Sequence, residues 1–240
     1  AREILRNVAA MEQLAAAHKD PLVGACRIGM PPTIGPYLTP LLLPVIKRYL
    51  PHITLELIEG LTDRLEDRLT DGALDVAILA TSPTRTNLTE IVLYDEPFWI
   101  AMPNDHPLTD QDVVDVTQIE PGELLLLSDG HCLRDQIYDA CKLDRTLTRR
   151  NGGPRTQQTS LATILALVGA GEGITLVPAM SLASGWVTDS GIAVRSEESG
   201  TAGRTVRLTL RKAYPRMALV EKLADIIAAC LPNTVPPARR

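Results

Sequence analysis

The chain has 240 residues, of which 45% are hydrophobic and 22% charged, with a formal net charge of -5 at neutral pH. A chain of this length can form one large α/β domain or two lobes of roughly 100 residues each. The acidic balance argues against direct binding of phosphate backbones, which needs clustered Lys and Arg. No apolar run reaches the roughly 20 residues of a membrane span. The charged N-terminal segment is not a secretory signal, so we expect a cytoplasmic protein.

The first half of the chain predicts alternating strands and helices. We expect residues 1–18 to form an otherwise polar helix with a narrow apolar stripe, which is typical of a helix that packs on a partner helix. A strand at 25–30, a helix at 34–49 and a strand at 53–60 form a βαβ unit. We expect Pro44 to bend or split the helix of this unit.

Further along the chain the same alternation continues. Leu61, Leu65 and Leu69 recur every fourth residue and predict a helix that ends at Gly72, before an apolar strand at 74–80. The run at 91–103 predicts a pair of strands or one strand that passes between two lobes. Beyond it we expect strands at 124–127, 174–178 and 204–212, and helices at about 132–142, 159–171 and 215–231.

The four cysteines, at positions 26, 132, 141 and 230, form no CxxC pair and no set with zinc spacing. The four histidines, at positions 18, 52, 106 and 131, are scattered, so we expect neither a metal site nor a cofactor. In a reducing cytosol a disulfide is usually transient, catalytic or sensory. Cys26 and Cys230 are interpreted as small buried hydrophobic residues.

The segment SDGHCLRDQIYDAC holds the other two cysteines. Asp129 or Gly130 can cap a helix that begins near Cys132, and such an N-terminus stabilises a thiolate, the form that attacks peroxide. Cys141 follows Leu133 and Ile137 at every fourth position, which places it on the apolar face of the helix.

The spacing of the two cysteines has a mechanical consequence. An intact helix holds residues nine positions apart about 13 Å from each other, whereas a disulfide allows at most about 7 Å between Cα atoms. If the two thiols react with each other, the segment between them has to unwind, and oxidation becomes a conformational switch. The spacing alone leaves the alternative open that one cysteine starts a helix and the other fills a core.

The run DGHCLRDQ, with a second cysteine nine positions after the first, resembles the OxyR family, the peroxide-sensing LysR-type bacterial transcription regulators. Three further runs support the resemblance, which covers about residues 20–215. MPPTIGPYLTPLLLP is similar to the start of a LysR-type effector domain, YDEP and NDHPL to its lobe crossing, and TSLATILALVGAGEGITLVP to a helix and strand of its second lobe.

This resemblance implies a two-lobed α/β fold like that of periplasmic binding proteins, with a parallel-rich sheet in each lobe. Such regulators carry an N-terminal winged helix-turn-helix, which this sequence does not include, so we expect the chain to sense but not to bind promoter DNA alone. The implied organisation is the end of a linker helix at 1–20, lobe I at 21–98, lobe II at 99–179, a return to lobe I with a C-terminal helix at 180–231, and a tail at 232–240.

The resemblance also implies roles for single residues. Cys132 matches the peroxidatic cysteine, which peroxide oxidises to sulfenic acid, and Cys141 matches the resolving cysteine, which then forms the disulfide. The implied peroxide pocket consists of Thr33, Thr62, Gly130, His131 and Arg204.

Four of the five pocket residues also have a purely structural interpretation. Thr33 and Thr62 can cap helices, His131 can be a turn residue, and Arg204 can be a surface charge on a strand. A small polar oxidant does need hydroxyl and N–H groups that orient it and stabilise charge on the leaving oxygen.

The first hypothesis is therefore a redox-sensing transcription regulator, not an enzyme. Its implied partners are hydrogen peroxide, further copies of itself in a dimer or tetramer, promoter DNA through the N-terminal domain, RNA polymerase, and a thiol reductant such as glutaredoxin or thioredoxin. The alternatives are a thiol peroxidase, which would turn over repeatedly, and a metabolite-sensing LysR-type or solute-binding domain with incidental cysteines.

Overall fold

The computed structural model describes residues 20–144, 157–158, 160–183 and 191–235, so the helix expected at 1–18 lies outside the described residues. The chain forms two compact α/β units, which are described separately. Unit 1 takes its described residues from 20–94 and 205–231, and unit 2 from 95–204 and 232–235. The predicted α/β class is confirmed.

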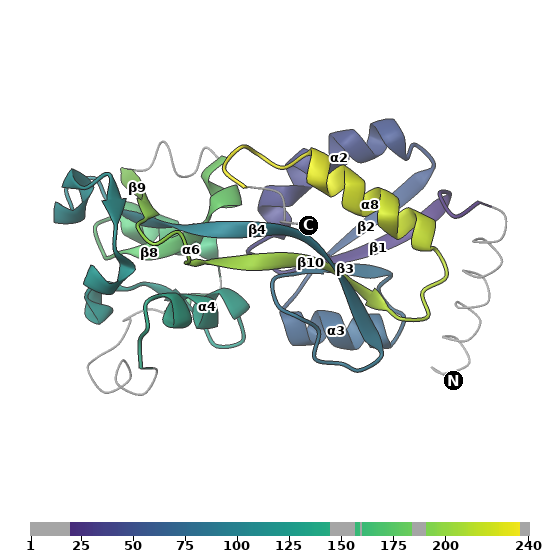
Figure 1. The fold of residues 1–240 in the computed structure, drawn as a ribbon, viewed down its shortest axis with the longest axis horizontal. Coiled ribbons are helices and arrows are strands. Elements are labelled where there is room, and N and C mark those ends of the chain that lie inside the picture. Colours follow the sequence, from purple (N-terminus) through teal and green to yellow (C-terminus); the bar gives the residue numbers. More distant parts are fainter. Residues whose placement is uncertain (1–19, 145–156, 159, 184–190, 236–240) are drawn as a thin grey trace. The chain divides into compact units, whose positions relative to one another are not determined.

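Unit 1 contains a mixed sheet with helices on both faces. The strand order is β2-β1-β3-β10-β4, where residues 88–94 of β4 (Leu88–Pro103) belong to this unit. β1 pairs in parallel with β2 and β3, and β10 is antiparallel to β3. Helices α2 and α8 lie on one face and α3 on the other (Figure 1). The elements are β1 (Gly24–Met30), α2 (Gly35–Tyr49), β2 (Ile53–Glu59), α3 (Thr62–Thr70), β3 (Val76–Leu79), β10 (Gly203–Arg211) and α8 (Met217–Ala229).

Helix α2 is not split at Pro44, so that part of the expectation was wrong: it runs as a single helix from Gly35 to Tyr49. Pro36, Pro40 and Pro44 are four residues apart and all exposed, so they lie on one solvent-facing stripe. A proline removes the hydrogen bond to the carbonyl four residues earlier, and on this stripe water can bind that carbonyl instead. The opposite face buries Leu38, Leu42 and Ile46.

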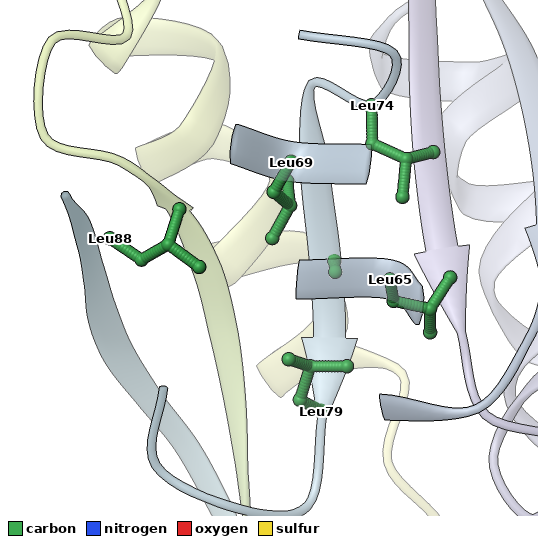
Figure 2. Packing of buried hydrophobic residues seen from close by; sticks show 6 residues of the cluster. Leu65, Leu69, Leu74, Leu79 and Leu88 are labelled. Carbon is green, nitrogen blue, oxygen red and sulfur yellow. The ribbon is translucent and has the colours of Figure 1, made fainter. Parts of the chain in front are cut away.

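The leucine repeat of α3 forms part of the core of unit 1, as predicted. Leu65 and Leu69 of the helix lie in one buried cluster with Leu79 of β3 (Figure 2). The helix ends before Gly72, whose φ of 71° lies in the left-handed region that glycine adopts without strain. This packing fixes the N-terminus of α3, where Thr62 lies. The cluster consists of Leu65, Leu69, Leu74, Ala77, Leu79 and Leu88.

Unit 2 contains a mixed sheet and a short parallel pair. β8 and β9 are antiparallel to β4, whereas β5 is parallel to β9 and β6 to β7. Helix α4 packs on β6, and α6 contacts β6, β7, β8 and β9. The strands are β4 (Leu88–Pro103), β5 (Val113–Val114), β6 (Leu126–Leu127), β7 (Gln157–Gln158), β8 (Thr175–Pro178) and β9 (Ile192–Glu197). The helices are η1 (Pro107–Asp110), η2 (Val116–Gln118), η3 (Pro121–Glu123), α4 (Cys132–Ala140), α6 (Leu161–Gly169) and η4 (Ala179–Ala183).

The bounds of the two units differ from the lobe ranges expected from the sequence. The first boundary falls between Tyr94 and Asp95, inside the continuous strand β4, rather than after residue 98. The second falls between Arg204 and Thr205 rather than at residue 180. The reason is that β9 pairs with β4 at Trp99–Pro103, which keeps β9 in unit 2. None of the helices in the described part of the chain has the length and apolarity needed to cross a membrane.

Candidate redox site

The turn before α4 presents Cys132 as the first residue of the helix. Gly130 has a φ of 92°, which favours glycine, and it turns the chain into the extended residue His131. The N-cap is His131, so the expected cap at Asp129 or Gly130 was wrong, and the His131 side chain makes no capping hydrogen bond. Cys132 is half-buried, whereas His131 is buried, and burial lowers the pKa of His131.

Arg134 ties this turn to the helix. Its Nη1 donates to the carbonyl oxygen of Leu127 at 3.2 Å, and its Nη2 lies 3.2 Å from Oδ1 of Asp129. The guanidinium also stands over the ring of Tyr138, 5.6 Å from the centroid. One side chain therefore joins β6, the turn and the second turn of α4. The sequence interpretation missed this role, although Arg134 belongs to the DGHCLRDQ run.

Cys141 lies at the other end of the same helix. It is the C-cap of α4 and only 5% exposed. Leu133 and Ile137 are buried on the same face, so the predicted apolar face is confirmed. Burial, with a smaller contribution from the nearby Glu197 carboxylate, raises the pKa of the Cys141 thiol to about 11. The thiol is therefore neutral and shielded while α4 is intact.

Glu197 is itself held in a fixed position at the end of β9. Its Oε1 accepts a hydrogen bond from the backbone N–H of Ser199 at 2.9 Å, and its Oε2 accepts one from the Ser199 hydroxyl at 2.8 Å. The N–H groups of Thr201 and Ala202 also donate to Oε2. These hydrogen bonds lower the pKa of Glu197 against the opposing effect of burial, which favours a fixed negative charge near Cys141.

Both cysteines are free thiols in this structure. Because α4 is one continuous helix from Cys132 to Ala140, the Cα atoms of the two cysteines are about 13 Å apart at 1.5 Å per residue. A disulfide requires a separation below about 7 Å. A bond between the two sulfur atoms therefore requires α4 to unwind.

Arg204 forms a buried ion pair rather than a surface charge. Its Nε donates to Oε2 of Glu96 at 2.8 Å, and the two side chains are 1% and 0% exposed. Oε1 of Glu96 accepts a hydrogen bond from the backbone N–H of Met180 at 2.9 Å. Glu96 thus connects β4, β10 and η4 within unit 2. The sequence interpretation missed this residue, although it stands in the YDEP run.

The two threonines of the implied pocket belong to unit 1. Neither is an N-cap: Ile34 caps α2 and Leu61 caps α3, without side-chain hydrogen bonds in either case. The capping interpretation of Thr33 and Thr62 was therefore wrong. Among the described residues, no group binds the buried hydroxyl of Thr62.

The other two cysteines differ in burial. Cys26 is fully buried in β1, and burial, together with the Asp75 carboxylate, raises the pKa of its thiol to about 12. Cys230 is half-buried at the end of α8, where its Sγ donates to the carbonyl oxygen of Ile227 at 3.3 Å. Burial also raises the pKa of Cys230. The interpretation as a buried residue is confirmed for Cys26 and holds only in part for Cys230.

A cavity of about 410 Å³ lies elsewhere in unit 2, beside His106, Glu123, Leu167 and Glu172. None of the candidate redox residues lines it. Within the part of the chain that the structure describes, no three His, Cys, Asp or Glu side chains are placed to hold a metal ion.

Comparisons with known proteins agree with this architecture. The model of the LysR substrate binding domain matches residues 19–231. The "Hydrogen peroxide-inducible genes activator" of Pectobacterium carotovorum subsp. carotovorum is 35% identical over 227 residues, which cover 95% of this chain and 74% of the relative. The "DNA-binding transcriptional dual regulator OxyR" of Escherichia coli K12 is 33% identical over 229 residues, which cover 95% of this chain and 73% of the relative.

The same similarity extends to solved structures. A hydrogen-peroxide-bound cysteine-to-serine mutant of OxyR from Corynebacterium glutamicum superimposes with a TM-score of 0.82 at 32% identity. The match covers 95% of this chain and 71% of that one. The predicted resemblance to OxyR and to the periplasmic-binding-protein-like fold is confirmed. The chain belongs to the LysR family of transcription regulators and contains its substrate binding domain.

Proposed function

We propose that this chain is the regulatory part of a hydrogen-peroxide-responsive transcription regulator, in which Cys132 is the peroxidatic and Cys141 the resolving cysteine. The observation that carries the proposal is the placement of two free thiols at opposite ends of one helix. Cys132 is half-buried at the N-terminus, and Cys141 is buried at the C-terminus. The names of the relatives support the same function.

The chemistry proceeds in two balanced steps. The Cys132 thiolate attacks one oxygen of hydrogen peroxide, the O–O bond breaks, and the leaving hydroxide takes a proton to become water. Cys132 is then a sulfenic acid. The Cys141 sulfur attacks the oxidised sulfur, the S–O bond breaks, and a second water leaves. In sum, two thiols and one peroxide give one disulfide and two waters.

The shielding of Cys141 separates the two steps in time. While α4 is intact, its thiol is neutral and buried, so it does not compete with Cys132 for peroxide. Unwinding of α4 exposes Cys141 only as the disulfide forms. The packing on β6 and the contacts of Arg134 are then lost or rearranged, which is the structural signal.

We assign Thr33, Thr62, Gly130, His131 and Arg204 to the peroxide pocket on the basis of the resemblance. Two observations support this assignment. The Thr62 hydroxyl is buried without a partner among the described residues, so it has a hydrogen bond to offer a ligand. His131 and Gly130 form the turn directly before the attacking sulfur.

In the regulator as a whole, units 1 and 2 would be joined to a DNA-binding domain. The regulator would act in the cytoplasm, where a disulfide is a transient signal. We propose that oxidation changes self-association in a dimer or tetramer, and thereby promoter binding and contact with RNA polymerase. A glutaredoxin or thioredoxin would restore the thiols.

The test is peptide mass mapping of the reduced protein after a slight excess of peroxide. We expect a Cys132–Cys141 disulfide in the unmodified chain. Cys132→Ser should leave Cys141 reduced, and Cys141→Ser should trap a sulfenic acid at Cys132 that a specific probe labels. Cys230→Ser is the matched control, since it removes another half-buried thiol and should leave the reaction unchanged.

Two outcomes of this experiment would contradict the proposal, and each would favour another function. If both thiols stay reduced in the folded protein, the chain is a metabolite-sensing LysR-type domain. If a thioredoxin-type reductant supports consumption of many equivalents of peroxide, the chain is a thiol peroxidase.

A further inference from the structure

The residue that follows the buried cysteine has an unusual backbone conformation. Lys142 has a φ of 52° and is, among the described residues, the one non-glycine with positive φ. In this left-handed region the Cβ atom of an L-residue crowds the following carbonyl oxygen. Glycine has no Cβ and adopts the same conformation without this cost.

Two backbone hydrogen bonds hold Lys142 in that conformation. The N–H of Leu143 donates to the carbonyl of Tyr138 at 3.0 Å, and the N–H of Lys142 donates to the carbonyl of Asp139 at 3.2 Å. This pair of bonds is a Schellman motif, in which the left-handed position is usually glycine. Both acceptors belong to the last turns of α4, so the bonds exist only while that end of the helix is intact.

Lys142, the strained residue, therefore lies in the motif that terminates the end of α4 that has to unwind. Cys141, directly before Lys142, is buried by the same helix end, and its N–H donates to the carbonyl of Ile137 at 2.9 Å. When α4 unwinds to bring Cys141 to Cys132, the two bonds of the motif break. Nothing then keeps Lys142 at positive φ, and it relaxes to an ordinary conformation.

We propose that Lys142 is a positioning residue that sets the redox equilibrium of the Cys132–Cys141 pair, because its left-handed conformation destabilises the reduced form and is released on oxidation. This inference rests on the proposed disulfide switch. A glycine at this position would make the reduced form more stable and the protein less easily oxidised. Lysine instead lowers the free energy needed to open the helix.

Two substitutions separate backbone strain from charge. K142G removes the side chain and the strain, whereas K142A removes the amine but keeps the Cβ atom that causes the strain. Asp115 interacts electrostatically with Lys142, and both variants remove that interaction equally. The comparison of glycine with alanine therefore isolates the left-handed conformation.

The experiment equilibrates the full chain with mixtures of reduced and oxidised glutathione and quantifies the Cys132–Cys141 disulfide by mass. In this exchange two protein thiols become one disulfide while one glutathione disulfide becomes two thiols. We expect K142G to raise the ratio of reduced to oxidised protein about fivefold over K142A, which corresponds to about 20 mV for a two-electron couple. The potential of K142G should be the less negative of the two.

Thermal unfolding of the two reduced variants provides the second measurement, and K142G should unfold at the higher temperature. Equal redox equilibria in K142G and K142A would overturn the inference, whether or not their thermal stabilities differ. Failure of the wild-type chain to form the disulfide would instead overturn the proposed function, so the two failures are distinguishable.

Discussion

Arg134→Met tests whether the turn before Cys132 holds the protein in its reduced form. The substitution keeps an unbranched side chain of similar length but removes the guanidinium that joins β6, Asp129 and Tyr138. If these contacts exist only with α4 intact, their loss destabilises the reduced form and leaves the disulfide form unchanged. We therefore expect easier oxidation.

The magnitude follows from the three contacts of Arg134. The charge-assisted hydrogen bond to the carbonyl of Leu127 contributes about 1–2 kcal/mol. Asp129 is 67% exposed, so its ion pair contributes at most about 0.5 kcal/mol in water and salt. The contact with the Tyr138 ring adds about 0.5 kcal/mol. The sum is about 2 kcal/mol, or roughly a 30-fold shift toward the disulfide at about 1.4 kcal/mol per factor of ten.

A glutathione titration with mass detection measures this shift. Asp129→Asn is the matched control: it removes the negative charge of the exposed ion pair but keeps the guanidinium, and it should shift the equilibrium by less than about threefold. If Arg134→Met lowers the overall stability but leaves the redox equilibrium within about twofold of the wild type, the contacts persist in both redox forms. Arg134 would then have no part in the switch.

Three further predictions concern stability and are measured by urea unfolding of the reduced protein. Glu96→Ala should cost about 3–5 kcal/mol because it leaves the Arg204 guanidinium buried without its carboxylate; a loss below about 1 kcal/mol would contradict a buried pair. Leu65→Ala should cost about 2–5 kcal/mol, clearly more than Leu57→Ala, because Leu57 is 37% exposed and Leu65 is 1% exposed. Burial raises the Cys141 pKa from near 9.0 to about 11, so the folded protein binds more protons than the unfolded chain in this range. Stability should fall as pH rises from 9 to 11, and Cys141→Ala should make that fall less steep, while the raised pKa of Cys26 keeps part of it.

Most of the local features followed from the sequence because they depend on neighbouring residues. The period of 3.6 residues placed Cys141 with Leu133 and Ile137 on one face of α4, and it buried Leu65 and Leu69 of α3. The βαβ unit at the start of the chain followed from the same kind of pattern. The two cysteines and the mechanical consequence of their spacing were also visible at this level.

The alternation of elements predicted the fold class but not where the chain passes between units. β9 belongs to unit 2 because it pairs with β4, which no pattern within residues 192–197 reveals. Local propensity also predicted that Pro44 bends or splits α2, and the split did not occur. The helix stays continuous because its three prolines lie on the exposed face. Which face of α2 is exposed depends on how the helix packs on unit 1.

The contacts that hold the candidate site needed the tertiary structure. Arg204 and Glu96 are 108 residues apart in the sequence, and their ion pair exists because β4 and β10 bring them together in a buried region. The left-handed conformation of Lys142 depends on two hydrogen bonds that form only at the end of the folded helix. Sequence periodicity thus determined which residues share a face, since that is a local property of the backbone. The partner that each face or charge meets was decided by packing between distant segments.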